Sequence, residues 1–180
     1  GMFALAIYDR SEQTVLLARD RFGIKPLYVL QQAGLLMFAS EIKGLLQHPS
    51  VSASVSLEAL NEYLTFQNVF SHRTLFEGVQ LLPAGTHMRV DLRDGQIGEP
   101  VPYWDYHFRE EEMSLEEAED RVYELLSRAV QRQLVSDVPL GSYLSGGIDS
   151  GSVAGLAAAS IPRISTFTGG FDMSSASGLE

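Results

Sequence analysis

The sequence predicts an α+β segment followed by an α/β segment, with the change near residue 105. The first part consists of short apolar runs at spacings too tight for crossover helices, so its strands should pair antiparallel. In the second part, a long amphipathic helix precedes a strand, a glycine-rich turn, a small-residue helix and another strand. That order has the βαβ form, which favours a parallel sheet. We therefore expect two domains, residues 1–105 and 106–180.

Four strands are expected early in the first domain. They cover residues 2–8, 14–18, 27–30 and 35–39. The first is continuously apolar, as in a strand that is buried on both faces. Ala33-Gly34, between the last two strands, predicts a hairpin turn. Ser40 should then cap a short helix that runs to Leu46.

A helix is predicted over residues 57–66, with Ser56 as its N-cap. Apolar residues recur there at the spacing of one helical face. They are Leu57, Leu60, Tyr63 and Leu64. Turns and short strands follow up to residue 102, with a turn at residues 81–85 and a strand over residues 87–92.

The second domain should begin with a helix from Leu115 to Leu134, because residues 114–117 have capping-box spacing and the apolar periodicity continues beyond them. A strand at residues 138–144, a helix from 149 to 160 and a strand at 164–168 complete the βαβ unit. One such unit cannot bury both faces of its sheet, so we expect further strands and helices beyond Glu180.

The composition, 45% hydrophobic and 20% charged residues, is that of a globular protein. A net charge of -10 without any basic run argues against a nucleic-acid partner. The sequence has neither an apolar stretch of about 20 residues for a membrane span nor a basic and apolar leader, so we expect no membrane association and a cytoplasmic location. The chain contains no cysteine, which excludes a thiol nucleophile within it.

Residues 144–150 read Leu-Ser-Gly-Gly-Ile-Asp-Ser and lie between a predicted strand and a predicted helix. The first turn of such a helix presents unpaired N–H groups and the positive end of its dipole, which attract anions. Gly146 and Gly147 leave the approach open, and Ser145 and Ser150 add hydroxyl donors. Asp149 would repel phosphates unless a divalent cation lies between them, so it is predicted to be a magnesium ligand.

The alternative is that this segment is a flexible turn and that Asp149 is only a helix-cap residue. The strand-loop-helix context and the complete order of residue types favour a pyrophosphate loop. The loop lacks the Gly-Lys-Ser/Thr ending of the other common phosphate loop, so chemistry at the α-phosphate fits better than γ-phosphate transfer.

Several segments of the chain together resemble those of known enzymes. Residues 145–150 resemble the loop of the ATP pyrophosphatases, a signature that several families share. Much more specific is the joint order of the other matching segments. These are residues 1–9, 19–28 (Arg-Asp-Arg-Phe-Gly-Ile-Lys-Pro-Leu-Tyr), 38–43 (Phe-Ala-Ser-Glu-Ile-Lys), 76–79, 82–85, 103–104 and 136–141. In this order they are similar to the glutamine-hydrolysing asparagine synthetase family, and the resemblance covers essentially the whole chain.

This resemblance implies the end of an antiparallel-sheet N-terminal-nucleophile glutaminase domain, followed by the start of a parallel-sheet pyrophosphate-loop synthetase domain. In that family, ammonia from glutamine reacts with an aspartate that ATP and Mg²⁺ have converted to β-aspartyl-AMP, giving asparagine, AMP and pyrophosphate. Aspartate and glutamine would thus be substrates of the whole protein, and the family admits a homodimer. Eight residues would contact ATP or its pyrophosphate: Tyr143, Leu144, Ser145, Gly146, Gly147, Asp149, Ser150 and Gly169. Tyr143 and Gly169 replace the aliphatic residues that are usual there.

The family's glutaminase uses an N-terminal cysteine as nucleophile, and this chain has none, so no catalytic residue is carried over. The chain is expected to be an internal fragment that by itself neither hydrolyses glutamine nor makes asparagine. Three alternatives stay open. The acceptor could be another carboxylate, such as a cell-surface saccharide or an antibiotic precursor; the chain could be a sulfur-transfer or tRNA-modifying pyrophosphatase; or it could be a non-catalytic nucleotide-binding remnant.

Two further groups of residues are interpreted as structural. Arg19, Asp20, Arg21 and Lys25 flank a turn, where charges are more often ion-paired than catalytic. Trp104 lies far from the loop in sequence, which favours packing over stacking on adenine.

Overall fold

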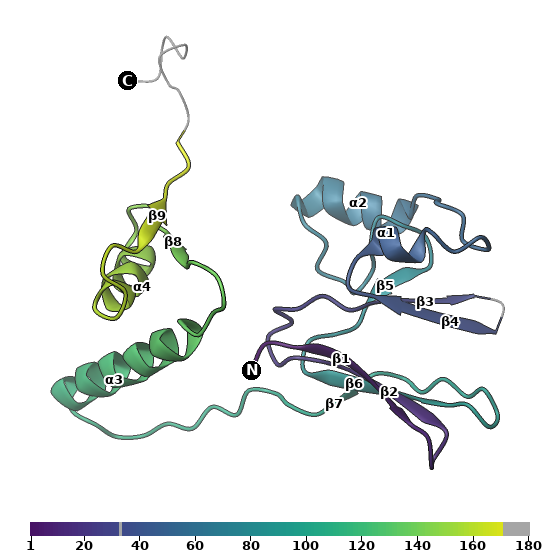
Figure 1. Cartoon of the computed structure of the whole chain (residues 1–180), viewed down its shortest axis with the longest axis horizontal. Helices are drawn as coiled ribbons and strands as arrows, with labels where there is room; N and C mark the ends of the chain where they lie inside the picture. The colour runs from purple at the N-terminus through teal and green to yellow at the C-terminus, as the bar shows by residue number, and fades with distance from the viewer. Residues whose placement is uncertain (33, 171–180) are drawn as a thin grey trace, which may run out of the picture. The chain divides into compact units, whose positions relative to one another are not determined.

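The computed structural model describes residues 1–32 and 34–170. The chain divides into two compact units, residues 1–108 and a second unit that begins at Arg109 (Figure 1). The first unit contains antiparallel sheets with helices, and the second contains a short parallel sheet with helices, as the sequence predicts. Among the helices of the described ranges, none has the length and apolar character that crossing a membrane requires.

A four-stranded antiparallel sheet in the order β1-β2-β6-β7 forms one layer of the first unit. Its strands are β1 (Ala4–Asp9), β2 (Thr14–Arg19), β6 (Thr86–Asp91) and β7 (Val101–Pro102). β1 is an edge strand of this sheet, and about half of Ile7 and Tyr8 is exposed, 52% and 55%. The prediction of a strand buried on both faces is therefore wrong, because an apolar run does not reveal what covers it.

The second layer is a three-stranded antiparallel sheet in the order β4-β3-β5. Its strands are β3 (Tyr28–Gln32), β4 (Leu35–Ala39) and β5 (Val79–Leu81). β3 and β4 pair from Tyr28↔Ala39 to Gln32↔Leu35, which confirms the predicted antiparallel hairpin. Gly34 has φ +78°, a conformation that glycine adopts without strain. Ala33, the other residue of the predicted turn, lies outside the described residues.

Two apolar clusters hold the layers of the first unit together. Leu17 of β2, Met88 of β6, Leu27 and Leu82 form the first cluster, against which Val29 of the other sheet packs. The second cluster lies on the opposite face of β3 and joins the buried side chains of Leu30, Leu45 and Val79. Strand alternation explains why neighbouring residues of β3 serve both clusters. The unit is thus layered sheet on sheet on helix (Figure 1).

The helices of this unit are α1 (Ile42–Leu45) and α2 (Leu57–Phe66). α1 has Glu41 as its N-cap instead of the predicted Ser40. The Ser56 cap of α2 is confirmed, since its Oγ accepts a hydrogen bond from the N–H of Ala59 at 3.3 Å. α2 buries Ala59, while Leu57 and Leu64 of the predicted apolar face are 74% and 72% exposed.

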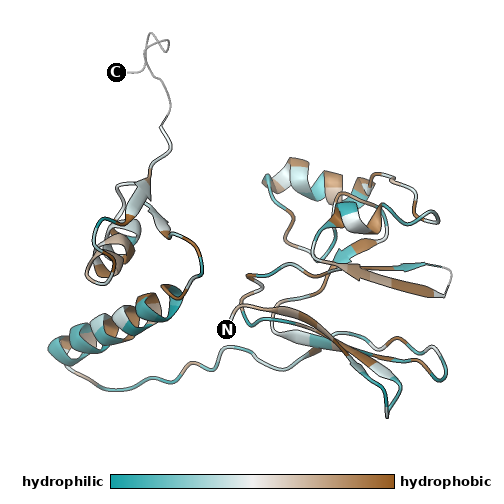
Figure 2. Ribbon diagram, in the orientation of Figure 1, coloured by the Kyte–Doolittle hydropathy of each residue, from teal (hydrophilic) through white to brown (hydrophobic). Residues whose placement is uncertain are grey.

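The second unit contains α3 (Leu115–Gln133), β8 (Gly141–Tyr143), α4 (Ile148–Ala158) and β9 (Ser165–Phe167). The predicted capping box begins α3, with Ser114 and Glu117 as its two members. α3 is mostly hydrophilic, with hydrophobic residues at intervals along it (Figure 2), and the helix packs against α4. Val130 of α3 and Ala154 and Ala157 of α4 are buried. β8 and β9 pair in parallel, as the βαβ pattern predicts.

Candidate functional site

The candidate loop joins the carboxyl end of β8 to the amino end of α4. Gly146 has φ +85°, and a Cβ added there would have no atom within 4 Å, so backbone conformation and open space both suit glycine. Gly147 is the N-cap of α4 and has no side chain that could cap the helix. The first turn of α4 therefore receives no hydrogen bond from a capping side chain, which leaves its N–H groups available to an anion.

Ser150 stabilises the loop from within. Its Oγ accepts a hydrogen bond from the N–H of Ser145 at 3.2 Å and donates to the carbonyl of Gly147 at 3.0 Å. The hydroxyls of Ser145 and Ser150 are 3.1 Å apart. The amide of Ser145 is thus already engaged, which leaves the amides after Gly146 as the better anion donors. The order of residue types predicts Ser150 as a hydroxyl donor to the phosphates, but it does not predict these hydrogen bonds within the loop.

The end of β9 holds the base of the loop. The N–H of Leu144 donates to the carbonyl of Phe167 at 2.9 Å, and Thr168 Oγ1 donates to the carbonyl of Leu144 at 2.5 Å. Gly169 follows Thr168 directly, so this glycine lies at the same sheet edge as the loop. The structure therefore brings the predicted residues from Tyr143 to Ser150 together with Gly169. The contact of the Thr168 hydroxyl with Leu144 could not be predicted from the order of residue types.

The remaining predicted positions are exposed. Asp149 lies in the first turn of α4 with its carboxylate accessible. Tyr143 ends β8 opposite Phe167, and 84% of its surface is exposed. In the described ranges, His, Asp and Glu side chains do not gather in groups of three or more that could hold a metal ion. The magnesium assignment therefore depends on Asp149 alone and stays a prediction.

The charged turn of the first unit is structural, as the sequence analysis interprets it, but ion pairing is not the reason. Asp20 is 1% exposed, and its carboxylate accepts four backbone N–H groups. They belong to Phe3, Phe22, Ile24 and Lys25, at 3.3, 3.1, 3.0 and 2.9 Å. The guanidinium of Arg19 donates to the carbonyls of Gly23, Lys25 and Leu82. The two charges are thus held by main-chain groups.

These contacts also set the pKa of Asp20. Burial alone would raise the pKa, but the hydrogen bonds from the four N–H groups outweigh it and hold the pKa below the ordinary 3.8. The carboxylate is therefore a fixed anion that organises the turn.

Trp104 packs within the first unit. Its ring meets Phe22 edge-on with centroids 5.2 Å apart, and it meets Tyr106 at 4.7 Å. The guanidinium of Arg21 lies 5.8 Å from the centroid of the Trp104 ring. Packing is therefore the observed role of this residue.

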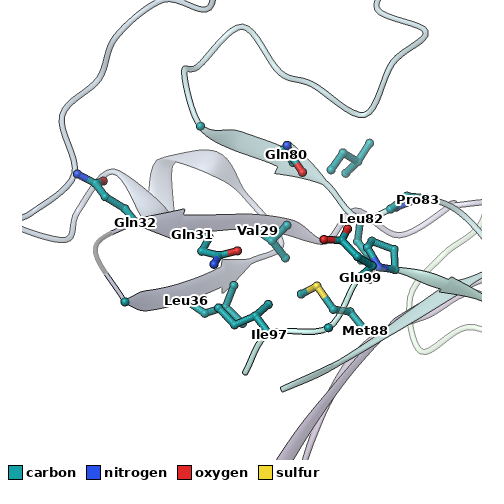
Figure 3. Close-up of a pocket in the computed structure, with 15 residues that line it drawn as sticks. Val29, Gln31, Gln32, Leu36, Gln80, Leu82, Pro83, Met88, Ile97 and Glu99 are labelled. Carbon is teal, nitrogen blue, oxygen red and sulfur yellow. The ribbon is translucent and has the colours of Figure 1, made fainter. Parts of the chain in front are cut away.

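Apart from the candidate loop, a hollow of about 540 Å³ opens between the two sheets of the first unit (Figure 3). Gln31, Gln80 and Glu99 supply its polar groups, while Leu36 and Met88 are among its apolar residues. Among the described residues that line it, Glu99 is the only charged one. None of the site residues predicted from the sequence lies here, and Met88 belongs to the core cluster between the sheets.

Both parts of the chain match models of known protein families. Residues 1–104 match the model of the glutamine amidotransferase domain, and residues 121–178 match the model of asparagine synthase. The chain belongs to the glutamine-hydrolysing asparagine synthetase family.

Curated relatives agree with this membership. The chain is 38% identical over 169 residues to asparagine synthetase [glutamine-hydrolyzing] 2 of Bacillus subtilis, a match that covers 88% of this chain and 22% of the relative. A putative asparagine synthetase of Mycobacterium tuberculosis is 35% identical over 179 residues, 96% of this chain and 27% of the relative. Amidase chyE of Penicillium rubens is 37% identical over 163 residues, 88% of this chain and 23% of the relative. The chain thus spans about a quarter of the length of the relatives that it matches.

Proposed function

We propose that residues 144–150 bind the pyrophosphate of Mg-ATP and that the chain forms part of a glutamine-dependent ligase. The supporting observation is the glycine-rich turn at the carboxyl edge of a parallel strand pair, directly before a helix whose N-cap is Gly147. The N–H groups of Gly147 and Ile148, together with the positive end of the α4 dipole, would hold the anion. The hydroxyl of Ser145 would add a donor at the same place.

Asp149 would hold the magnesium ion, because Mg²⁺ usually combines one or two carboxylates with phosphate oxygens and water. Its place in the first turn of α4 puts a carboxylate beside the proposed phosphate position. When bound, ATP would supply the adenylate group that activates a carboxylate substrate. The chain's own part is to orient the phosphates so that pyrophosphate can leave.

For the whole protein we infer the reaction of the family. Aspartate is converted to asparagine with ammonia from glutamine, through β-aspartyl-AMP, with release of AMP and pyrophosphate. The supporting observations are the names of the relatives, which are glutamine-hydrolysing asparagine synthetases. The test is to incubate the whole protein with aspartate, glutamine and Mg-ATP and to measure asparagine and pyrophosphate. A lack of aspartate-dependent pyrophosphate release would refute aspartate as the acceptor.

A second candidate keeps the adenylating chemistry and changes the acceptor to another carboxylate. The relatives named amidases favour it, because their 36–37% identity to this chain lies within the 34–38% range of the Bacillus subtilis synthetases. Pyrophosphate release that needs a different carboxylic acid would support this candidate.

The nucleotide site can be tested on the whole protein by calorimetric titration with ATP, with and without Mg²⁺. We expect Mg²⁺ to strengthen binding to the wild type and Asp149→Ala to abolish that strengthening. Binding of metal-free ATP should not weaken in the variant, because a carboxylate beside the phosphates has been removed. Asp120→Ala is the matched control, since it removes an exposed carboxylate from α3. Equal Mg²⁺ dependence in wild type and Asp149→Ala would refute the magnesium assignment, and a wild type that does not bind ATP would refute the loop as a nucleotide site.

A further inference from the structure

The first residue of the loop is fixed at both of its main-chain groups by a single strand end. The parallel ladder finishes at the pair Tyr143↔Phe167, so Leu144 is the first residue beyond it. Its N–H reaches the carbonyl of Phe167, and its own carbonyl accepts the hydroxyl of Thr168 at 2.5 Å. A side chain thus continues the pairing by one step past the last strand residue.

The loop beyond Leu144 has little else to hold its direction. Gly146 and Gly147 have no side chains to pack, and the hydrogen bonds of Ser150 join parts of the loop to one another and to α4. Those bonds preserve the shape of the loop but do not tie it to β9. The bond from Thr168 is the side-chain contact that sets the base of the loop relative to the next strand.

We propose that Thr168 is a positioning residue for the nucleotide site, an inference that rests on the proposed function above. By holding the carbonyl of Leu144, its hydroxyl fixes the angle at which the loop leaves β8. A loop already in its binding conformation loses less conformational entropy when a ligand binds. Thr168 also precedes Gly169, so the same bond connects the loop with the other predicted contact of the nucleotide.

The effect should appear in affinity rather than in folding. Thr168 is exposed, and an exposed hydrogen bond of this kind contributes little to global stability. Thr168→Val keeps the shape and the strand preference of threonine but removes the hydroxyl. Thr168→Ser keeps the hydroxyl and removes the methyl group. Thr166→Val makes the same change on the same face of β9, at a residue paired with Ser142 in the ladder.

The experiment is to titrate Mg-ATP into the wild type and these three variants, and to follow amide exchange of residues 144–147 and thermal unfolding in each. We expect Thr168→Val to bind Mg-ATP about two- to tenfold more weakly and to exchange these amides faster, with an unchanged unfolding temperature. Thr168→Ser should restore the affinity, and Thr166→Val should match the wild type.

Equal affinity of wild type and Thr168→Val would overturn the positioning role, and so would a loss of affinity that Thr168→Ser does not rescue. If the wild type itself does not bind Mg-ATP, the proposed function fails and this role fails with it. The wild-type titration therefore separates the two failures.

Discussion

Asp20→Asn tests whether the buried carboxylate organises the first unit. The four N–H groups are divided evenly, with Phe22 and Ile24 on Oδ1 and Phe3 and Lys25 on Oδ2. Asparagine keeps one oxygen, so two donors would face an NH₂ group that cannot accept. An unsatisfied buried donor costs about 1–3 kcal/mol, which gives a loss of about 2–6 kcal/mol. The partial exposure of these contacts favours the lower end of that range.

The measurement is urea unfolding followed by the fluorescence of Trp104, the only tryptophan, which packs against Phe22 in the same unit. A loss of about 2 kcal/mol should lower the urea midpoint by roughly 1 M. Asp9→Asn is the matched control, because Asp9 accepts the N–H groups of Ser11 and Glu12 on Oδ1 alone. An amide can reproduce that arrangement, so the midpoint should not move. Equal shifts in the two variants would refute the reasoning.

The same carboxylate predicts a pH dependence. Because the pKa of Asp20 is lowered in the folded protein, its contribution to stability is complete above the unfolded pKa of about 3.9 and is lost as the pH falls through the folded value. Asparagine does not titrate. The difference between the midpoints of wild type and Asp20→Asn should therefore be constant near neutral pH and should shrink below about pH 4. A difference that does not change with pH would contradict this assignment.

Three further substitutions test the rest of the chain. Gly141→Ala would place a Cβ 2.6 Å from the ring of Phe167, so it should disrupt the β8–β9 pair and speed amide exchange at Leu144, which hydrogen-deuterium exchange would detect. Gly146→Ala forces φ +85° on a residue with a side chain, a strain of about 1–2 kcal/mol that should weaken Mg-ATP binding in calorimetry without lowering the unfolding temperature of the first unit. Ser56→Ala removes the N-cap of α2 and should cost about 1 kcal/mol in urea unfolding, whereas Ser54→Ala in the preceding loop should cost less.

Local patterns in the sequence predict most of the elements. Two examples are the capping box at Ser114 and Glu117 and the tight spacing of β3 and β4. Each depends on residues that are close in the chain, so each can be recognised in a single sequence. Burial is a different matter. The apolar run of β1 and the apolar face of α2 are both largely exposed, because periodicity shows which residues lie on one side and not what covers that side.

In the candidate site, too, the local features could be predicted from the sequence and the contacts between distant residues could not. Its glycines and acidic residue follow from their order in the sequence, since anion binding at a helix start needs those residue types at that spacing. The engagement of Ser150 with Ser145 and of Thr168 with Leu144 depends on hydroxyl rotamers and on where a strand 24 residues away ends. The carbonyl partners of Arg19 lie up to 63 residues away, and no spacing rule predicts them.

The Arg19 region also has a consequence for the order of folding. The hydroxyl of Tyr103 donates to the carbonyl of Arg19 at 2.7 Å, across 84 residues of sequence, and β2 pairs with β6 about 70 residues later. The β1–β2 hairpin can form early. β2 can pair along its other edge only after β6 has been made, and the carbonyl of Arg19 at the end of β2 can bind the hydroxyl of Tyr103 only after that residue has been made. Such high contact order slows folding, because the entropy of closing the loop is lost before the contacts form. On the ribosome, the first sheet can close only after the segment that leads into the second unit has been made.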